Sequence, residues 1–259
     1  MSFDISHLLD GWEYQPGQVI VRRFTGKDGE DKIQLRVDLG ILQMNAHGRP
    51  DGKRPYGRPS LLEYFTARLD RHLEENDGSD EQYVLSAEDC SRLQMEALQF
   101  HHRCICLLQL EDFGAAVRDT NRNLKVLDFV DEYAESDEIA WNLNQFRPQV
   151  LMLRTRSLAM QRLKRKDFGG AVDRVKDGLK AIREFYQAFE REDLLEQSAE
   201  ILALEDWLND IQEKRPLSKR EQLENDLTDA VMREDYEKAA RVRDQIRKLD
   251  AERSKGAGR

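Results

Sequence analysis

Cysteine and long apolar runs are scarce in this chain of 259 residues, and its 41 basic residues are outnumbered by 50 acidic ones. Only three cysteines are present, two of them in a C-x-C pair, which is too few for a disulfide framework. No window approaches the roughly 18 apolar residues that a membrane-spanning helix needs. We therefore expect a protein without disulfides and without a membrane span.

The charge balance is acidic, with a net charge of −9 at pH 7. This argues against a general nucleic-acid binder, because such domains usually present a basic face. The stretch from Met1 to Trp12 has neither a basic start nor a long apolar run, so we expect no signal peptide. Together these features predict a cytoplasmic protein.

What is present favours helices. Charged residues make up 35% and apolar residues 39% of the chain, which leaves enough apolar material for a core. The length suits one large domain or two modest ones. We expect a mainly α (α+β) fold with three regions: a small β-meander with its connector at 1–59, a helical array at 60–215, and a helical hairpin with a short disordered tail at 216–259.

Strand character is confined to the first region. Val19 to Phe24 is rich in β-branched residues and ends at a Gly/Asp turn. Ile33 to Leu39 alternates apolar and polar residues, and the alternation shifts phase after Gly40. These patterns predict an antiparallel meander of two to four strands. The stretch 47–59 holds three prolines and three glycines and should be an irregular connector.

Helix signals dominate the second region. Ser60 with Glu63, and Ser86 with Asp89, have the spacing of N-terminal capping pairs. Pro216 should stop the last helix of the array. The expected helices span 60–75, 86–110, 113–133, 137–166, 168–189 and 191–214.

An internal repeat lies within these helices. Leu108 to Val117 aligns with Leu163 to Val172, displaced by 55 residues, and each copy has an Asp-Phe turn between two helices. This resembles the hinge of tetratricopeptide repeats, in which an aromatic residue wedges between two helices. The spacing departs from the 34-residue period of that family, and Asn123 and Gly178 stand where it usually has alanine. We expect a tetratricopeptide-like array of about two units.

The same resemblance implies a binding groove. On the tetratricopeptide pattern, four polar side chains would point into the concave face of the array. Such a mixture could receive an acidic peptide tail, although the asparagine expected of a carboxylate clamp is missing. The four candidate groove residues are His101, Gln109, Arg156 and Lys164.

The third region contains two short amphipathic helices. The first, about 218–233, and the second, about 236–252, each carry one apolar stripe. Only Glu234 and Asp235 lie between them, so the helices should run antiparallel. A hairpin this small has too little core to be a domain alone, which predicts a docking element.

The hairpin sequence L-x-x-x-L-x-x-A-V-x-x-E-D-Y-E-K-A-A, from Leu223 to Ala240, closely resembles the UVR motif of UvrB and UvrC. Tyr236 stands where the family usually has Phe. The resemblance implies a protein–protein contact and no catalysis, with a UVR-type or Clp-type partner or a second copy of the chain. No Walker A sequence accompanies it, so helicase chemistry is not expected. The partner-binding candidates are Leu223, Leu227, Val231, Tyr236, Ala239, Ala240, Ile246 and Leu249.

Other constellations allow two interpretations. His102 and Cys106 are four apart on a helix, which suits two zinc ligands, but two ligands do not make a site and small buried cysteines explain the pattern better. Likewise, the basic residues of the connector could bind an anion or DNA, but a solvated linker is the simpler interpretation. No catalytic set stands out. We expect no metal and no cofactor.

These observations predict a non-enzymatic protein–protein adaptor of a bacterial cytoplasm that docks a partner through the hairpin and through its array. The alternative is an accessory factor of nucleotide excision repair that contacts DNA or UvrB/UvrC-type partners. In that alternative the connector residues Arg49, Lys53, Arg54 and Arg58 would touch the DNA. An enzyme with an unrecognised site is a third hypothesis.

Overall fold

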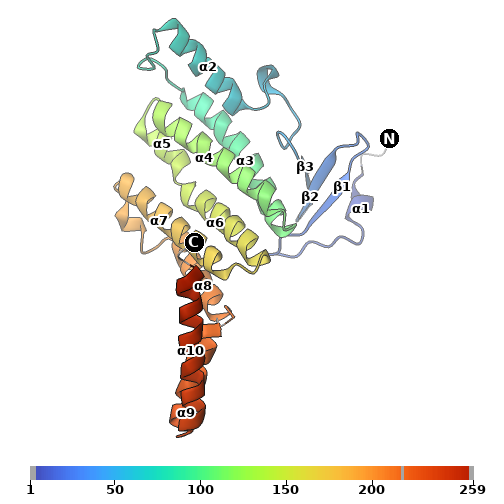
Figure 1. The fold of residues 1–259 in the computed structure, drawn as a ribbon. Helices are drawn as coiled ribbons and strands as arrows, with labels where there is room; N and C mark the ends of the chain where they lie inside the picture. The colour runs from blue at the N-terminus through green and yellow to red at the C-terminus, as the bar shows by residue number, and fades with distance from the viewer. Residues whose placement is uncertain (1–3, 217–218, 257–259) are drawn as a thin grey trace. The chain divides into compact units, whose positions relative to one another are not determined.

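The protein is described here by a computed structural model, which covers residues 4–216 and 219–256 (Figure 1). The side chains of residues 219–221 and 249–256 are also outside the description. The chain divides into two compact units, Met1–Ile211 and Gln212–Arg259. Most of it is helical and one small antiparallel sheet lies near the N-terminus, which confirms the predicted mainly α fold. The predicted disordered tail falls partly on residues 257–259, outside the described residues.

The sheet of the first unit has three antiparallel strands in the order β1-β2-β3, as the meander pattern predicts. Val37 pairs with Gly40, so the phase shift seen in the sequence is a tight hairpin turn at Asp38 and Leu39. Ile33 and Met44 are paired neighbours and both are buried. The strands are β1 Val21–Thr25, β2 Asp31–Val37 and β3 Gly40–Asn45.

Except for the short helix α1, which precedes it, the helices of the first unit follow the sheet in the chain (Figure 1). Helix α3 packs against α4, α4 against α6, and α6 against α7. Short 3-10 turns occupy Pro55–Gly57 and Glu192–Leu194. The helices are α1 Ser6–Leu9, α2 Leu61–Glu75, α3 Ala87–Gln109, α4 Phe113–Tyr133, α5 Asp137–Asn144, α6 Arg147–Lys164, α7 Phe168–Ala188 and α8 Ala199–Glu213.

Two predicted helices were wrong in extent. The single helix expected at 137–166 is broken into α5 and α6, because Pro148 lies in the first turn of α6, where its missing N–H costs nothing. The helix expected from Arg191 begins only at Ala199. Its start is marked by Ser198, whose hydroxyl accepts the backbone N–H of Ile201 at 3.4 Å.

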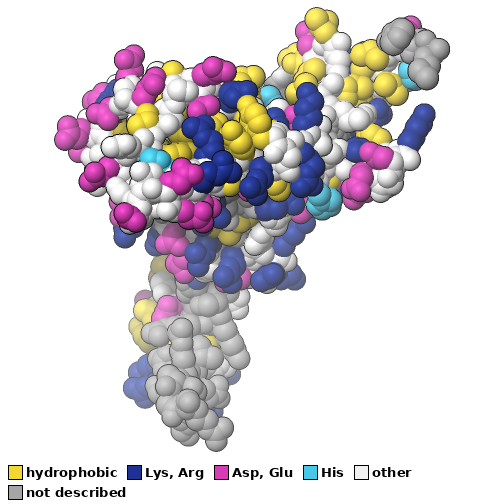
Figure 2. Space-filling view, turned by 90° about the horizontal axis from the view of Figure 1, so that it is seen from above, with side chains coloured by type: hydrophobic (Ala, Val, Ile, Leu, Met, Phe, Trp, Pro, Cys, Tyr) yellow, Lys and Arg dark blue, Asp and Glu magenta, His cyan; other side chains and the backbone are white. Residues whose placement is uncertain are grey.

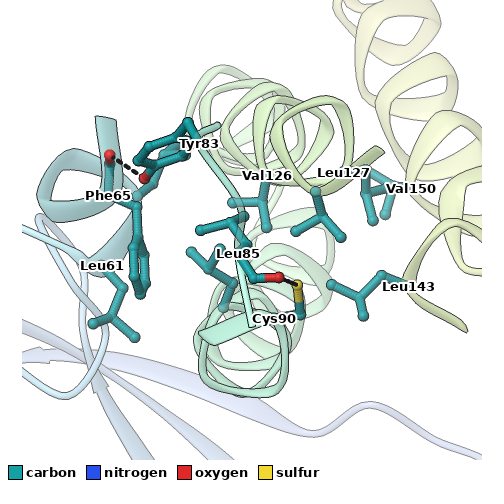
Figure 3. Close-up of a cluster of buried hydrophobic side chains, with 12 residues drawn as sticks. Leu61, Phe65, Tyr83, Leu85, Cys90, Val126, Leu127, Leu143 and Val150 are labelled. Atoms are coloured by element: carbon teal, nitrogen blue, oxygen red, sulfur yellow. Dashed lines mark hydrogen bonds between the residues drawn. The ribbon is translucent and has the colours of Figure 1, made fainter. Parts of the chain in front are cut away.

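One cluster of buried apolar side chains joins α2, α3 and α4 (Figure 3). Within it, the hydroxyl of Tyr83 donates to the backbone carbonyl of Phe65 at 2.9 Å, so the phenol is buried with its polar end satisfied. A second cluster lies between α6, α7 and α8. A third joins the sheet to α3, with Ile33 and Met44 in the same cluster as Leu107. The sheet therefore shares this third cluster with the helices.

Buried charges also tie the connector to the helices. Arg49 of the connector lies 3.2 Å from the fully buried carboxylate of Glu96 on α3. That carboxylate also accepts the backbone N–H of Leu61, at 2.9 and 3.1 Å, and pairs with Arg122 of α4. The side chain of Ser60 donates to Glu63 and accepts no backbone N–H. The predicted capping pair of Ser60 and Glu63 is therefore wrong as to the acceptor. The first turn of α2 is capped by Glu96, a carboxylate 35 residues away from Leu61.

The two aligned Asp-Phe turns have the same geometry. Asp112 and Asp167 each begin a helix, and their carboxylates accept the N–H three residues on at 3.2 and 2.9 Å. The residues before them, Glu111 and Lys166, both have positive φ, 56° and 59°. The chain therefore leaves one helix through a left-handed residue and enters the next through an Asp cap in both copies.

Candidate partner-binding surfaces

The second unit is a helical hairpin of α9 Lys219–Met232 and α10 Tyr236–Gly256, which pack against each other. Its turn repeats the two upstream turns, because Glu234 has φ of 57° and Asp235 accepts the backbone N–H of Lys238 at 2.9 Å. The predicted antiparallel pairing follows from this short connection. An N-capped turn of this kind holds the end of the hairpin in one conformation.

The residues of the predicted apolar stripe differ in how far they are buried. Leu223 and Ala239 are buried, together with Ala230 and Val242, which the site prediction left out. Ala240 is exposed and Leu227 and Ile246 are half-buried, while the side chain of Leu249 lies outside the described residues. Val231, Met232 and Tyr236 are 52%, 71% and 70% exposed. Large apolar side chains exposed beside one another are typical of a contact surface.

A second apolar surface follows the neighbouring faces of α3 and α6 in the first unit. A pocket of about 350 Å³ lies at one end, and Met95, Leu98 and Phe146 on its rim are 61%, 43% and 47% exposed. His101 is part of its lining. Burial lowers the pKa of His101, so this imidazole is neutral at pH 7. The rest of the lining is Gln94, Ala97, Asn123, Leu127, Leu143, Gln149 and Val150.

Further along the same two helices is a pocket of about 420 Å³. It contains Gln109 and Arg156, two of the four candidate groove residues. Lys164, a third, lies beside it, because its Nζ is 2.8 Å from Glu111 and 5.0 Å from the ring centre of Phe113. His101 belongs to the first pocket instead. The remaining lining is Val19, Ile105, Leu108, Glu111, Phe113, Leu153, Met160 and Trp207.

Helix α6 has five basic residues and no acidic one, in a chain whose net charge is −9. Four of the five meet oxygen partners: Arg147 pairs with Asp128, Arg154 bonds to Asn121, Arg162 pairs with Asp167, and Lys164 pairs with Glu111. Arg156 is different. Its guanidinium carbon lies 5.5 Å from the ring centre of Trp207, and no carboxylate of the described residues pairs with it.

Seen from the α2 side, basic side chains gather around apolar ones in the middle of the face, and many acidic side chains lie at its rim (Figure 2). The connector contributes exposed cations to the first unit. Lys53, Arg54 and Arg58 are exposed, whereas Arg49 is engaged with Asp51 and Glu96. Tyr56 stacks on Tyr64 of α2, with ring centres 4.1 Å apart, as a linker that packs on the helices should do.

The two candidate metal ligands are His102 and Cys106. Burial raises the pKa of the Cys106 thiol to about 12 and lowers that of His102, so the two groups face an environment that disfavours charge. Among the described residues, no group of three or more histidine, cysteine or acidic side chains is placed to hold a metal ion.

In the same part of the chain, no helix combines the length and the apolar composition needed to cross a bilayer.

Residues 218–252 match the family model of the UvrB/uvrC motif, which covers α9 and most of α10. This suggests involvement in UvrB/UvrC-type interactions or in a function related to DNA repair. No curated protein and no solved structure matches the chain. The recognised resemblance is thus confined to the second unit, and the first unit has to be interpreted from its own geometry.

Proposed function

We propose that the chain is a non-enzymatic adaptor of a bacterial cytoplasm that docks a partner protein through the exposed end of its UVR hairpin. The observation that carries this proposal is the group Val231, Met232 and Tyr236, three large apolar side chains that remain exposed around one N-capped turn. The match to the UvrB/uvrC motif supports it, because this motif is an interaction module in UvrB and UvrC.

The three side chains contribute part of the binding free energy. Full burial of one large apolar side chain contributes roughly 1.5–3 kcal/mol, so three contribute at most about 9 kcal/mol. Association costs at least about 4 kcal/mol, so a micromolar affinity needs further contacts around this end. The first unit, a tetratricopeptide-like helical array in this proposal, would present its α3/α6 groove as a second surface.

The test measures binding of the full chain to immobilised UvrB, UvrC and a Clp ATPase, each purified, by biolayer interferometry. The variant Met232→Ser plus Tyr236→Ser should lose at least about tenfold in affinity for the partner that binds. Leu39→Ser, which removes a 90% exposed leucine in the β2–β3 turn, is the matched control and should bind as wild type. Unchanged binding by the double variant would overturn the assignment of the docking end.

A second candidate is an accessory factor of nucleotide excision repair that contacts DNA. The observation that favours it is the trio Lys53, Arg54 and Arg58, which are exposed and have no ion-pair partner among the described residues. Retention on duplex DNA should then weaken with salt, and replacing the trio with Gln should lower the salt slope by about three. If the chain shows no DNA retention at low salt, this candidate fails.

A further inference from the structure

The docking end of the hairpin is acidic as well as apolar. Residues 222–237 contain six acidic residues and one basic residue, Arg233. Glu234 and Asp235 form the turn itself, directly beside the exposed Met232 and Tyr236. A surface that receives this end therefore needs an apolar floor and at least one cation that is free to meet a carboxylate.

The larger pocket of the α3/α6 groove has this combination. Its floor is apolar, with Leu108, Met160 and Trp207 in the lining. Arg156 is exposed there and has no ion pair among the described residues. Lys164 at its border is already paired with Glu111. The cation available to an incoming carboxylate in this pocket is therefore Arg156.

The size of the pocket is compatible with side-chain insertion. Its volume of about 420 Å³ lies in the range of about 300–1,000 Å³ that is usual for pockets that hold an organic group. The guanidinium of Arg156 is planar and held over an indole ring, so it is partly oriented before a carboxylate arrives. Such preorganisation lowers the entropy cost of forming the ion pair.

We propose that the hairpin end of one copy of this chain docks into the α3/α6 groove of a second copy. Met232 and Tyr236 would enter the pocket beside Leu108, Met160 and Trp207, and Glu234 would pair with Arg156. The proposal rests on the proposed function only in its use of the hairpin end as the docking element. The contact joins two different surfaces, so it is heterologous, and two copies can close it by reciprocal exchange or extend it into chains.

The test is sedimentation velocity of the full-length chain over a range of concentrations at low salt. Wild type should associate as its concentration rises. Arg156→Glu and Glu234→Lys should each weaken association by about tenfold or more, because each places like charges opposite one another. Lysine is tolerated at the left-handed position 234, since Lys166 occupies the equivalent position of the upstream turn.

Charge exchange provides the decisive comparison. An equimolar mixture of Arg156→Glu and Glu234→Lys chains should associate as well as wild type, because each hairpin end again meets an opposite charge. Lys176→Glu, a reversal at an exposed position of α7, is the matched control and should behave as wild type. A concentration-independent monomer would overturn the proposal. So would association that Arg156→Glu leaves intact, as pairing of two hairpins would give.

The two proposals fail separately. Arg156→Glu leaves the hairpin end untouched, so UvrB, UvrC or the Clp ATPase should still bind through that end, with at most the contribution of the groove lost. Self-association that is lost while partner binding through the hairpin end persists supports the groove contact. Self-association that is retained overturns the groove contact and leaves the proposed function standing.

Discussion

Arg103 and Asp119 form a buried two-point ion pair between α3 and α4. The Nε atom of Arg103 lies 2.7 Å from Oδ2 of Asp119 and a terminal nitrogen lies 2.9 Å from Oδ1, with both side chains 1% exposed. The other terminal nitrogen donates to the backbone carbonyls of Asn45 and Gly48, at 2.9 and 2.8 Å. One guanidinium thus joins two helices to the end of β3 and the connector.

Breaking this pair should be costly. Asp119→Asn leaves Arg103 buried without its counter-charge, so we expect the free energy of unfolding to fall by about 3–5 kcal/mol. Urea titration followed by circular dichroism measures this. The double variant Arg103→Met plus Asp119→Leu should lose less than the two single losses added together, because neither charge is then stranded. Additive losses would show that the pair is not energetically coupled.

The Asp caps should each contribute to stability. Asp167→Ala removes the acceptor of the Gly170 N–H and should lower the free energy of unfolding by about 1 kcal/mol. Lys166→Gly, one residue earlier, should raise it by up to about 1 kcal/mol, because φ there is 59° and glycine adopts such values without strain. The opposite signs of these two changes in the free energy of unfolding distinguish the contribution of the Asp167 cap from that of the left-handed residue before it. Equal destabilisation by both would contradict this description.

Gly178 and Gly169 form a matched pair on α7. A Cβ at Gly178 would lie 2.1 Å from Oγ1 and 2.8 Å from Cβ of Thr155, so Gly178→Ala should force α6 and α7 apart and destabilise by about 1–3 kcal/mol. A Cβ at Gly169 would meet nothing within 4 Å. There alanine should stabilise by about 0.5–1 kcal/mol, since it is the better helix former. Thermal unfolding of both variants tests the contrast.

The thiols should be inert in the folded protein. Burial raises the pKa of Cys104 and Cys106 to about 12 and that of Cys90 to about 11. We expect negligible reaction with a thiol reagent at pH 8, and three modified thiols per chain in urea. The folded pKa values lie above the ordinary value of 9.0, so the unfolded chain loses these protons first. Stability should therefore fall as pH rises above about 9. Fast labelling of the native chain would contradict this.

Sequence patterns located the helices best where local chemistry sets their ends. The helix starts after Ser86, Asp112 and Asp167 match the prediction because a side chain three residues from its N–H partner is a local signal. The break between α5 and α6 was missed although Pro148 signals it. There the buried Asn144 also donates to Leu127 of α4, a contact across 17 residues that the pattern does not reveal.

The buried ion pairs and hydrogen bonds could not be predicted either, because they also join residues that are far apart in the chain. Glu96 looks like one of many solvated acids, yet it meets groups 26, 35 and 47 residues away in the chain. In the hairpin, the helical spacing of the apolar residues reveals the stripe. That spacing alone does not tell which of these residues pack between α9 and α10 and which remain exposed at the end of the hairpin. Ala239 and Tyr236 are therefore both predicted to bind a partner, and only the structure shows that Ala239 is buried and Tyr236 is exposed.

The alanines inside the hairpin have a consequence for its motion. Ala230 and Ala239 contribute little buried apolar area, so α9 and α10 should open locally more often than a helix such as α4, whose buried face contains Val126, Leu127 and Val130. Their amide hydrogens should exchange with solvent correspondingly faster. A bound partner would add apolar area at the end of the hairpin and slow this exchange. Protection of α9 and α10 would then report occupancy directly, whichever protein occupies the site.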